Sequence, residues 1–282
     1  MQDTKKKVLS GGRILTFRKM IYRYYEENRR DLPWRRTDDP YHILVSELML
    51  QQTQVERVLN KYELFISRFP SVFSLADASL KEVLSIWHGL GYNRRALSLI
   101  GLARVITEKY HGQFPADFRE LTELPGIGPA TAGCLLAFAY RIPVVFIETN
   151  IRRVFIYHFF KDREDVHDKE IFPLVEATLD RKSPRDWYYA LMDYGSALRK
   201  TIDNPNKQSL HYSRQSAFEG SDRKIRGVIL KSLIAETSLT EKQIIQATGA
   251  EQRRARKILV DLISEGFLKK TGSSYALSDK SS

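Results

Sequence analysis

The chain has 282 residues, of which 43% are hydrophobic and 28% are charged. This composition is typical of a globular protein and excludes a disordered chain, and the one cysteine, Cys134, excludes an intramolecular disulfide and an all-cysteine metal site. A net charge of +11 favours a polyanionic partner, most commonly nucleic acid. Without a bilayer-length apolar run or a signal-peptide pattern, we expect a cytoplasmic protein without membrane contact.

Helical periodicity dominates the first 200 residues, whereas strand patterns are sparse. The sequence therefore predicts an all-α fold. In chain order, helices are expected within residues 13–30, 41–69 (two helices), 79–91, 94–112, 117–124, 129–141, 151–161, 170–180 and 185–200.

A polar, turn-rich segment at residues 201–224 indicates an ordered loop that runs into a linker. Residues 222–282 follow, with 12 Lys+Arg against 7 Asp+Glu, a local charge of +5. They predict a helix, a short helix, a longer third helix at 250–267 and two short strands about Gly272, which resembles a winged helix-turn-helix module. Such a module places its third helix in a DNA groove, although packing on the main domain or on a partner protein is the alternative.

The stretch "VVFIETNIRRVF", residues 144–155, changes from a strand-like apolar pattern to a helical one at Glu148. One interpretation is an ordinary helix start, because Thr149 and Asn150 are good N-caps and an acid suits the helix dipole. The other is that Glu148 is a catalytic carboxylate held at a helix N-terminus.

The segment "LTELPGIGPATAG", residues 121–133, predicts a helical hairpin. Pro129 occupies the first position of the second helix. Gly126 and Gly128 let the main chain approach another molecule closely, and Ile127 between them can fasten the turn to the core. With Thr131, these residues form a candidate seat for a DNA phosphate at a helix N-terminus; an ordinary helix–helix turn is the alternative.

Five ordered segments resemble the helix-hairpin-helix (HhH-GPD) DNA glycosylases, and within them the adenine-glycosylase or MutY branch. They are "LPWR" (32–35), "DPYHILVSELMLQQTQV" (39–55), "HGLGY" (88–92), "FPADFRELTELPGIGPATAG" (114–133) and "IETNIRRV" (147–154). The resemblance covers about residues 25–200. It implies a glycosylase core over residues 1–221, with a six-helix barrel lobe at about 35–140, a second lobe from 10–34 plus 141–221, and the winged-helix-like module at 222–282.

Hydrolysis of an N-glycosidic bond requires an acid that protonates the leaving base and a carboxylate that stabilises the cationic sugar. Glu47 lies among apolar residues, where burial should raise its pKa, and it matches the general acid of the family. Glu148 matches the catalytic aspartate but is one methylene longer. The position of the lysine in strand-cleaving relatives is Ala130, so we expect hydrolysis without strand cleavage.

The resemblance also implies roles for residues outside the two carboxylates. Arg35 and Asn150 match residues that line the base pocket, with a phosphate contact or an ion pair to Asp38 or Asp39 as the alternative for Arg35. The residues expected to wedge into the base stack and to contact the opposite base are Gln52, Leu90 and Tyr92; a surface amide and a core tyrosine are the alternatives for Gln52 and Tyr92.

Four departures from the family pattern limit what the resemblance implies. No cysteine follows residue 134, so neither an iron–sulfur cluster nor another metal site is expected, and contacts of the 201–220 loop must replace the cluster. The domain that recognises 8-oxoguanine is replaced by the basic module. Tyr189 and Ala130 each replace a polar residue of the adenine pocket. These four departures add to the replacement of aspartate by Glu148.

The sequence predicts a monofunctional, monomeric, nucleoid-associated enzyme that acts on double-stranded DNA with a mispaired base. Adenine opposite 8-oxoguanine or guanine is the expected target. Thymine, uracil or a modified pyrimidine opposite guanine is the alternative substrate, and a non-catalytic DNA-binding protein is the alternative class. A monovalent cation between the hairpin and a phosphate remains open.

Overall fold

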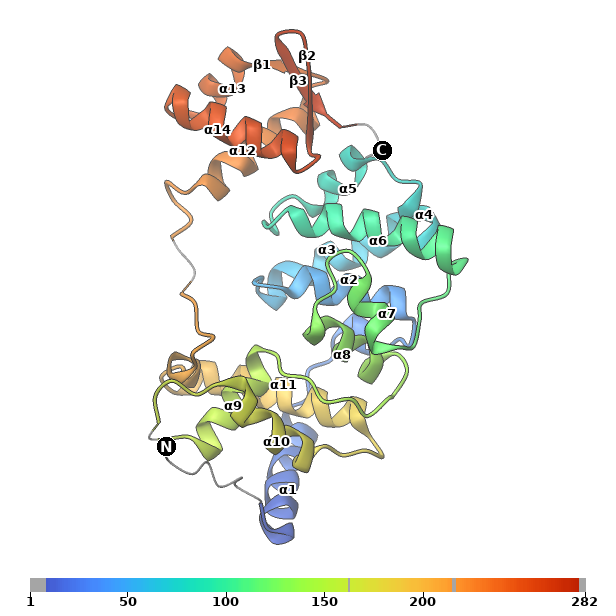
Figure 1. The fold of residues 1–282 in the computed structure, drawn as a ribbon, viewed down its shortest axis with the longest axis vertical. Coiled ribbons are helices and arrows are strands. Elements are labelled where there is room, and N and C mark those ends of the chain that lie inside the picture. Colours follow the sequence, from blue (N-terminus) through green and yellow to red (C-terminus); the bar gives the residue numbers. More distant parts are fainter. Residues whose placement is uncertain (1–8, 162, 215–216, 279–282) are drawn as a thin grey trace. The chain divides into compact units, whose positions relative to one another are not determined.

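A computed structural model describes residues 9–161, 163–214 and 217–278, and its α-helices confirm the predicted helical fold (Figure 1). The chain divides into two compact units. The first contains residues 1–43, 116–122 and 127–214; the second contains residues 44–115, 123–126 and 215–282.

The first unit is a helical bundle. Its elements are α1 (Gly11–Asn28), η1 (Pro33–Arg35), most of α7 (Phe118–Glu123), α8 (Pro129–Phe138), α9 (Thr149–Phe159), α10 (Asp168–Thr178), α11 (Pro184–Thr201) and η2 (Pro205–Gln208). Helix α11 packs against α1 and α9. Phe17, Phe155 and Trp187 meet where these helices join, with ring centroids 5.5 Å (Phe17 to Phe155) and 6.0 Å (Phe17 to Trp187) apart.

The second unit combines a helical core with the C-terminal residues. Its first helices are α2 (Pro40–Leu50, which begins in the first unit), α3 (Val55–Arg68), α4 (Val72–Ala76), α5 (Leu80–Trp87) and α6 (Arg94–Tyr110). Helix α6 packs against α4 and α5. Buried Phe65, Trp87 and Leu99 contribute to its apolar core.

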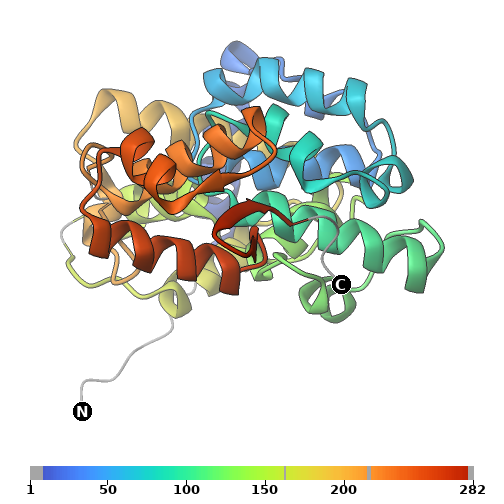
Figure 2. The same ribbon diagram turned by 90° about the horizontal axis from the view of Figure 1, so that it is seen from above.

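Residues 222–278, the C-terminal module, have the predicted winged-helix order. The elements are α12 (Asp222–Ala235), β1 (Leu239–Thr240), α13 (Glu241–Thr248), α14 (Gln252–Ser264), β2 (Leu268–Thr271) and β3 (Ser274–Leu277). The strands form an antiparallel sheet in the order β1-β3-β2. The sequence analysis missed β1 because two residues are too few to show an alternating pattern. Figures 1 and 2 show α14 and the β2–β3 hairpin side by side.

The observed units differ from the expected boundaries. Residues 35–43 and most of α7 lie in the first unit instead of the predicted barrel lobe, and two larger differences concern α8 and the C-terminal module. Helix α8 packs against α11 and belongs to the unit of α9 and α11. It does not belong to the predicted barrel lobe. The C-terminal module belongs to the unit of α5, on which α12 packs. The module therefore packs on the main domain through α12, whereas the insertion of α14 into a DNA groove stays a prediction.

The apolar stretch before Glu148 forms no strand and is not part of a sheet. The Tyr188 hydroxyl donates to the Val144 carbonyl oxygen over 2.7 Å, and the Phe146 ring packs on Tyr188 with centroids 4.1 Å apart. Residues 142–147 are apolar because they cover helices, which is why they resemble a strand in sequence.

Candidate active site

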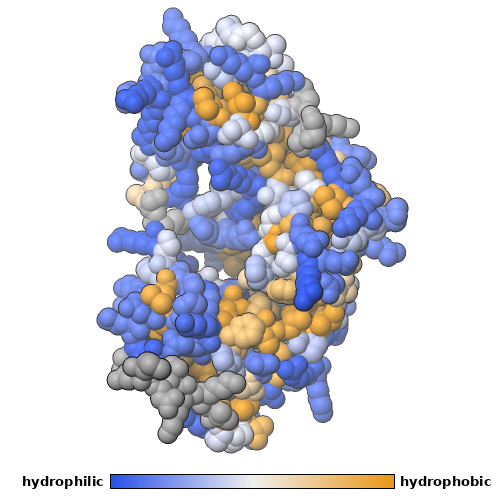
Figure 3. Space-filling model, viewed as in Figure 1, coloured by the Kyte–Doolittle hydropathy of each residue, from blue (hydrophilic) through white to orange (hydrophobic). Residues whose placement is uncertain are grey.

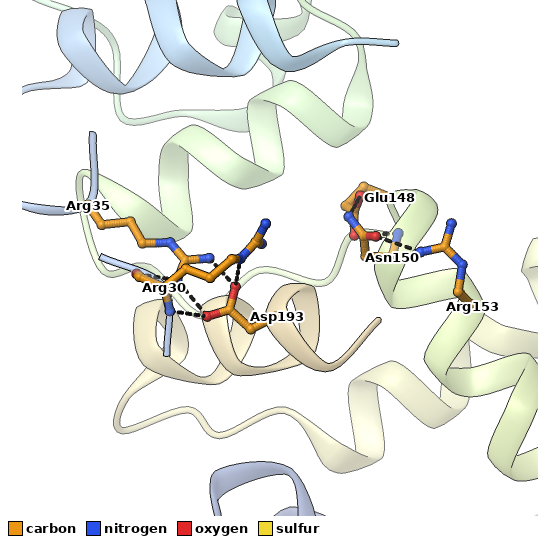
Figure 4. Close-up of polar contacts among 6 residues, drawn as sticks. All are labelled: Arg30, Arg35, Glu148, Asn150, Arg153 and Asp193. Atoms are coloured by element: carbon orange, nitrogen blue, oxygen red, sulfur yellow. Dashed lines mark hydrogen bonds and ion pairs between the residues drawn. The ribbon is translucent and has the colours of Figure 1, made fainter. Parts of the chain in front are cut away.

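Glu148 is the N-cap of α9, and its side chain is held by the first turn of that helix. Its Oε1 accepts hydrogen bonds from the main-chain N–H groups of Asn150 and Ile151, both over 2.7 Å (Figure 4). The helix start therefore exists, but Glu148 itself caps it instead of Thr149 or Asn150. The two predicted interpretations are compatible, because one carboxylate oxygen caps the helix.

Burial raises the pKa of Glu148 above the ordinary value of 4.5, while the two N–H donors and the cations Arg153 and Arg152 oppose that rise. Hydrogen bonds and positive charges stabilise the ionised form of a carboxyl group, whereas desolvation disfavours it. The site therefore holds a carboxylate that is harder to ionise than a surface glutamate.

Asn150 connects Glu148 to a buried guanidinium group. Its Nδ2 donates to Glu148 Oε2 over 3.2 Å, and its Oδ1 accepts from Arg153 Nη1 over 2.7 Å. Arg153 also donates to the Gly195 carbonyl oxygen over 2.7 Å. A Cβ at Gly195 would lie 2.5 Å from the Asn150 carbonyl oxygen, so only glycine allows α11 to approach α9 this closely.

The loop after α11 is tied to the same network by side-chain amides. Arg153 Nε donates to Asn204 Oδ1 over 3.2 Å, and Asn206 Nδ2 donates to the Thr149 carbonyl oxygen over 3.0 Å. Farther along, main-chain bonds join Val166 to Gln208 over 2.8 Å and Leu210 to Val166 over 3.1 Å. These hydrogen bonds hold the loop in place. It is the loop whose contacts were expected to take the place of an iron–sulfur cluster.

Arg35 is paired with a buried carboxylate that the sequence analysis did not identify. Its Nη1 and Nη2 donate to Asp193 over 2.8 and 2.7 Å, and Arg30 Nε donates to Asp193 over 2.6 Å (Figure 4). Asp193 is 3% exposed. Burial raises the pKa of Asp193, but the arginines outweigh it and leave that pKa below the ordinary value. Asp38, one of the alternative partners expected for Arg35, pairs instead with Arg185 and Arg141.

Tyr189 completes this cluster with an aromatic face. The Arg35 guanidinium carbon lies 4.3 Å from the Tyr189 ring centroid, within the range of a cation–π contact. Tyr189 also stacks on the Phe138 ring, with centroids 4.3 Å apart. A depression beside the cluster is strongly basic; its lining residues are Tyr25, Arg29, Arg30, Asp31, Arg35, Arg36, Arg185, Asp186 and Tyr189. Ala130 lies half-buried in the first turn of α8.

Glu47 belongs to the second unit and lies on α2. It is half-buried, whereas Leu44, Val45, Ser46, Leu48 and Met49 around it are buried. This confirms the expected apolar setting. The raised pKa of Glu47 stays a prediction, and so does its pairing with Glu148 in one reaction.

The predicted wedge residues lie on two turns joined by a buried arginine that the sequence analysis also missed. Arg95 donates to the carbonyl oxygens of Leu48 and Gln51, each over 2.6 Å, and to that of Gly91 over 2.9 Å. Burial lowers the pKa of Arg95 to about 10. The hydrogen bonds of Arg95 therefore fix the C-terminal end of α2 to the "GLGY" loop, residues 89–92. One feature of the sequence could have identified Arg95 as buried. It is a charged residue on the apolar face of the helix predicted at 94–112, four residues before Leu99.

Gln52 and Tyr92 both adopt left-handed main-chain conformations, with φ of 55° and 47°. Such conformations are strained for residues other than glycine and cluster at functional sites. Gln52 is exposed and Tyr92 is half-buried. Leu90 differs from the expectation because it is 5% exposed; it supports the loop from inside instead of projecting from it.

The hairpin turn has the predicted local geometry. Ile127 and Thr131 are buried, while Gly126 and Gly128 are exposed. Gly126 has a φ of 78°, and a Cβ there would lie 2.6 Å from the Ser98 Cβ. Gly128 is the N-cap of α8 and a Cβ there would meet nothing within 4 Å. The fold therefore requires glycine at 126, whereas nothing in the described chain requires it at 128.

Comparison with known proteins places these features in a family. Residues 45–180 match the HhH-GPD superfamily of base excision DNA repair proteins. The adenine DNA glycosylase of Mycolicibacterium smegmatis is 33% identical over 268 residues, which cover 88% of this chain and 91% of that protein. The chain belongs to the HhH-GPD superfamily. Similar curated proteins include further adenine DNA glycosylases, among them one from Homo sapiens that is 32% identical over 66% of this chain and 36% of that protein.

The coverage of these HhH-GPD relatives varies. The adenine DNA glycosylase of Buchnera aphidicola subsp. Baizongia pistaciae is 35% identical over 66% of this chain, which spans 53% of that relative's length. Among solved structures, a thermostable thymine-DNA glycosylase matches with a TM-score of 0.60 and 25% identity over 70% of this chain and 92% of that one. A non-covalent endonuclease III–DNA complex matches with a TM-score of 0.55 and 17% identity over 66% and 85%, which shows the fold alone.

The residues of this HhH-GPD chain do not fit an iron–sulfur cluster. Its one cysteine, Cys134, is buried in α8, whereas such clusters are held by several cysteine thiolates. Among the described residues, no group of three or more His, Cys, Asp and Glu side chains could hold a metal ion. In the same part of the chain, no helix is both long and apolar enough to cross a membrane.

Proposed function

We propose that this chain is a monofunctional DNA glycosylase that flips a mispaired base out of duplex DNA and hydrolyses its N-glycosidic bond. The proposed target is adenine opposite 8-oxoguanine or guanine. The observation that carries the proposal is the match to an adenine DNA glycosylase over 91% of that relative's length. The Glu148 carboxylate, fixed at the start of α9, supplies a group that the chemistry needs.

In the proposed reaction, Glu47 protonates the leaving base and Glu148 stabilises the cationic sugar. A base leaves readily only after it gains a proton, and the C–N bond breaks with positive charge on the sugar. An ionised Glu148 provides the negative charge. Its helix N–H donors and the nearby Arg153 stabilise the ionised form against the protonation that burial favours. Above its raised pKa, Glu148 therefore carries the negative charge that stabilises the cationic sugar.

Strand cleavage by these enzymes requires an amine that attacks the sugar. The position that would carry it holds Ala130, in the first turn of α8. We therefore expect an intact strand with an abasic site as the product. Borohydride should trap no covalent adduct between the enzyme and DNA.

The proposed partner is duplex DNA, bound by a monomer that is cytoplasmic and nucleoid-associated. Solved neighbours with the same fold include complexes of endonuclease III with DNA. In this chain the exposed Gly128 precedes the α8 N-terminus, where main-chain N–H groups suit a phosphate. A monovalent cation bridging the hairpin to that phosphate is part of this proposal. No other cofactor is proposed.

The C-terminal module offers a second surface for the DNA backbone. On α14, Arg253 and Lys257 are exposed one helical turn apart, and Lys269 and Lys270 are exposed on β2. Figure 3 shows hydrophilic residues over much of the module at the top of the view. Exposed cations on adjacent elements favour phosphate contacts.

Removal of thymine, uracil or a modified pyrimidine opposite guanine is the second candidate. It is favoured by the 25% identity to a thymine-DNA glycosylase and by Tyr189, which packs between Phe138 and Arg35. A non-catalytic DNA-binding protein would not need two carboxylates at Glu47 and Glu148.

Labelled duplexes carrying A, T, U or a modified pyrimidine opposite G or 8-oxoguanine test the substrate. Each product is analysed with and without alkali. Alkali-dependent cleavage at A supports the proposed function, and cleavage at a pyrimidine supports the second candidate. Binding without cleavage of any duplex would contradict both and favour a DNA-binding protein.

A further inference from the structure

The C-terminal module contacts the "GLGY" loop through a side chain in its first helical turn. Arg223 Nη1, from α12, donates to the Tyr92 hydroxyl oxygen over 2.9 Å. The Arg223 guanidinium carbon also lies 5.4 Å from the Tyr92 ring centroid. Both residues belong to the same unit. One side chain of the module therefore holds the ring and the hydroxyl group of the exposed end of the loop.

A second contact fastens the module beside the same loop. Glu265, just after α14, accepts hydrogen bonds from Arg226 of α12 and from Arg94, the first residue of α6. The distances are 3.0 Å from Arg226 Nη1 and 2.5 Å from Arg94 Nη2. Glu265 is well covered, with a side-chain exposure of 13%. Since Arg94 lies two residues after Tyr92, this ion-pair cluster anchors the module at the C-terminal edge of the loop.

The N-terminal edge of the loop is covered by the same helix. Helix α12 packs along α5, which ends at Trp87. Burial lowers the pKa of His88, and the positive charge of Lys231 on α12 adds to that effect. The module thus lies close to the residues on both sides of the loop.

The loop needs such support because its main chain is strained at Tyr92, which has a φ of 47°. Gly89 and Gly91, with φ values of 94° and 71°, adopt such conformations without strain. Tyrosine in this region is costly and persists only where the surroundings fix it. Arg95 holds the loop from inside through the Gly91 carbonyl oxygen, and Arg223 holds it from outside through the Tyr92 side chain.

We propose that the C-terminal module is a positioning element for the "GLGY" loop, in which Arg223 holds the Tyr92 side chain ready for insertion into the base stack. The role in DNA rests on the proposed function, whereas the positioning of the loop does not. The surface that contacts the opposite base then includes a cation from the module. Changes in the module are transmitted to base flipping through Arg223 without altering either carboxylate.

Hydrogen exchange in the DNA-free full-length protein tests the positioning. The reporters are the amides of Leu90 and Arg95, which donate to the Trp87 and Tyr92 carbonyl oxygens over 3.1 and 3.0 Å. The variants are Arg223→Met, Tyr92→Phe and their combination. Lys224→Met is the matched control: it removes one positive charge from the next position of α12, where the ammonium group pairs with Glu219.

Arg223→Met should accelerate exchange of these amides about tenfold, the loss expected for one hydrogen bond of ordinary strength. Tyr92→Phe removes the hydrogen bond but keeps the ring under the guanidinium group, so its effect should be equal to or smaller than that of Arg223→Met. The double variant should be no faster than Arg223→Met alone, because both changes act on one pair of side chains. Lys224→Met should exchange like the parent protein. Unchanged exchange in Arg223→Met, or effects of the two single variants that add in the double variant, would overturn the proposal.

A fluorescence measurement extends the test to DNA without relying on excision. A duplex with 2-aminopurine beside the mispair brightens when the neighbouring base is unstacked, and Arg223→Met should reduce this signal at saturating protein while Lys224→Met should not. An equal signal in parent and Arg223→Met protein would overturn the role in insertion. A parent protein that unstacks and binds DNA but excises no base would contradict the proposed function and leave the positioning role intact.

Discussion

The Glu148 side chain accepts a hydrogen bond from the main-chain N–H of Ile151 over 2.7 Å. The same oxygen accepts a second bond from Asn150, so two helix N–H groups determine where this carboxylate lies. A shorter side chain cannot place its oxygens in the same position without moving the helix. The structure thus positions a glutamate where the resemblance to the family implies an aspartate.

Glu148→Asp should therefore slow base excision by about 100-fold, because a displacement of about 1 Å is enough for such a loss. Glu148→Gln, which keeps the length and removes the charge, should abolish detectable excision. Single-turnover rates on the preferred duplex measure both effects. An aspartate variant faster than the parent protein would show that glutamate is the poorer group at this position.

The pH dependence of excision follows from the direction of the Glu148 pKa. Burial raises that pKa above 4.5, and the reaction needs the ionised form. Excision should therefore increase with pH through a value above 4.5 and decline below it. Single-turnover rates between pH 4 and 8 give this profile, with folding monitored by circular dichroism at each pH. A rate that stays constant down to pH 4.5 would contradict the assignment.

Asp193→Asn should destabilise the first unit. The buried Arg35 and the partly exposed Arg30 would lose their counter-charge, and breaking a buried pair such as Arg35–Asp193 by removing one partner costs about 3–5 kcal/mol. Asp31→Asn is the matched control, because Asp31 pairs with Arg36 on the surface and its loss should change stability far less than that of Asp193. Urea unfolding of both variants measures the difference; equal midpoints would contradict the structural role of Asp193.

Glu265 should make the stability of the second unit depend on acid pH. Its bonds to Arg94 and Arg226 lower its pKa to about 2. A carboxyl group with a lowered folded-state pKa contributes stability above its unfolded pKa and loses it as the pH falls through the folded value. Because Arg94 is largely exposed, we expect a loss of about 1–2 kcal/mol between pH 5 and 2. Glu265→Gln should remove this contribution at pH 7, measured by thermal unfolding.

Local patterns in the sequence predicted the helices, the hairpin and the winged-helix order well. Pro129 and Ile127, for example, take their positions from their immediate neighbours. Pairings between distant segments were not predictable in this way. Arg35 pairs with Asp193, 158 residues later, and Arg223 meets Tyr92 across 131 residues. Neither pairing leaves a periodic signal, because it depends on how whole helices pack.

The strand-like reading of residues 144–148 failed for a related reason. An apolar run reports burial, but it does not report whether the burying surface is a sheet or a set of helices. Here Tyr188 and Phe146 show that helices cover it.

The most direct test of the two-carboxylate account is the variant Glu47→Gln, compared with the parent protein on the duplex that the parent prefers. The account predicts that single-turnover excision falls below detection while the DNA dissociation constant changes by less than about tenfold, since one uncharged isostere removes a proton donor and leaves the binding surface intact. Excision by Glu47→Gln at the rate of the parent protein would contradict the assignment of Glu47 as the general acid.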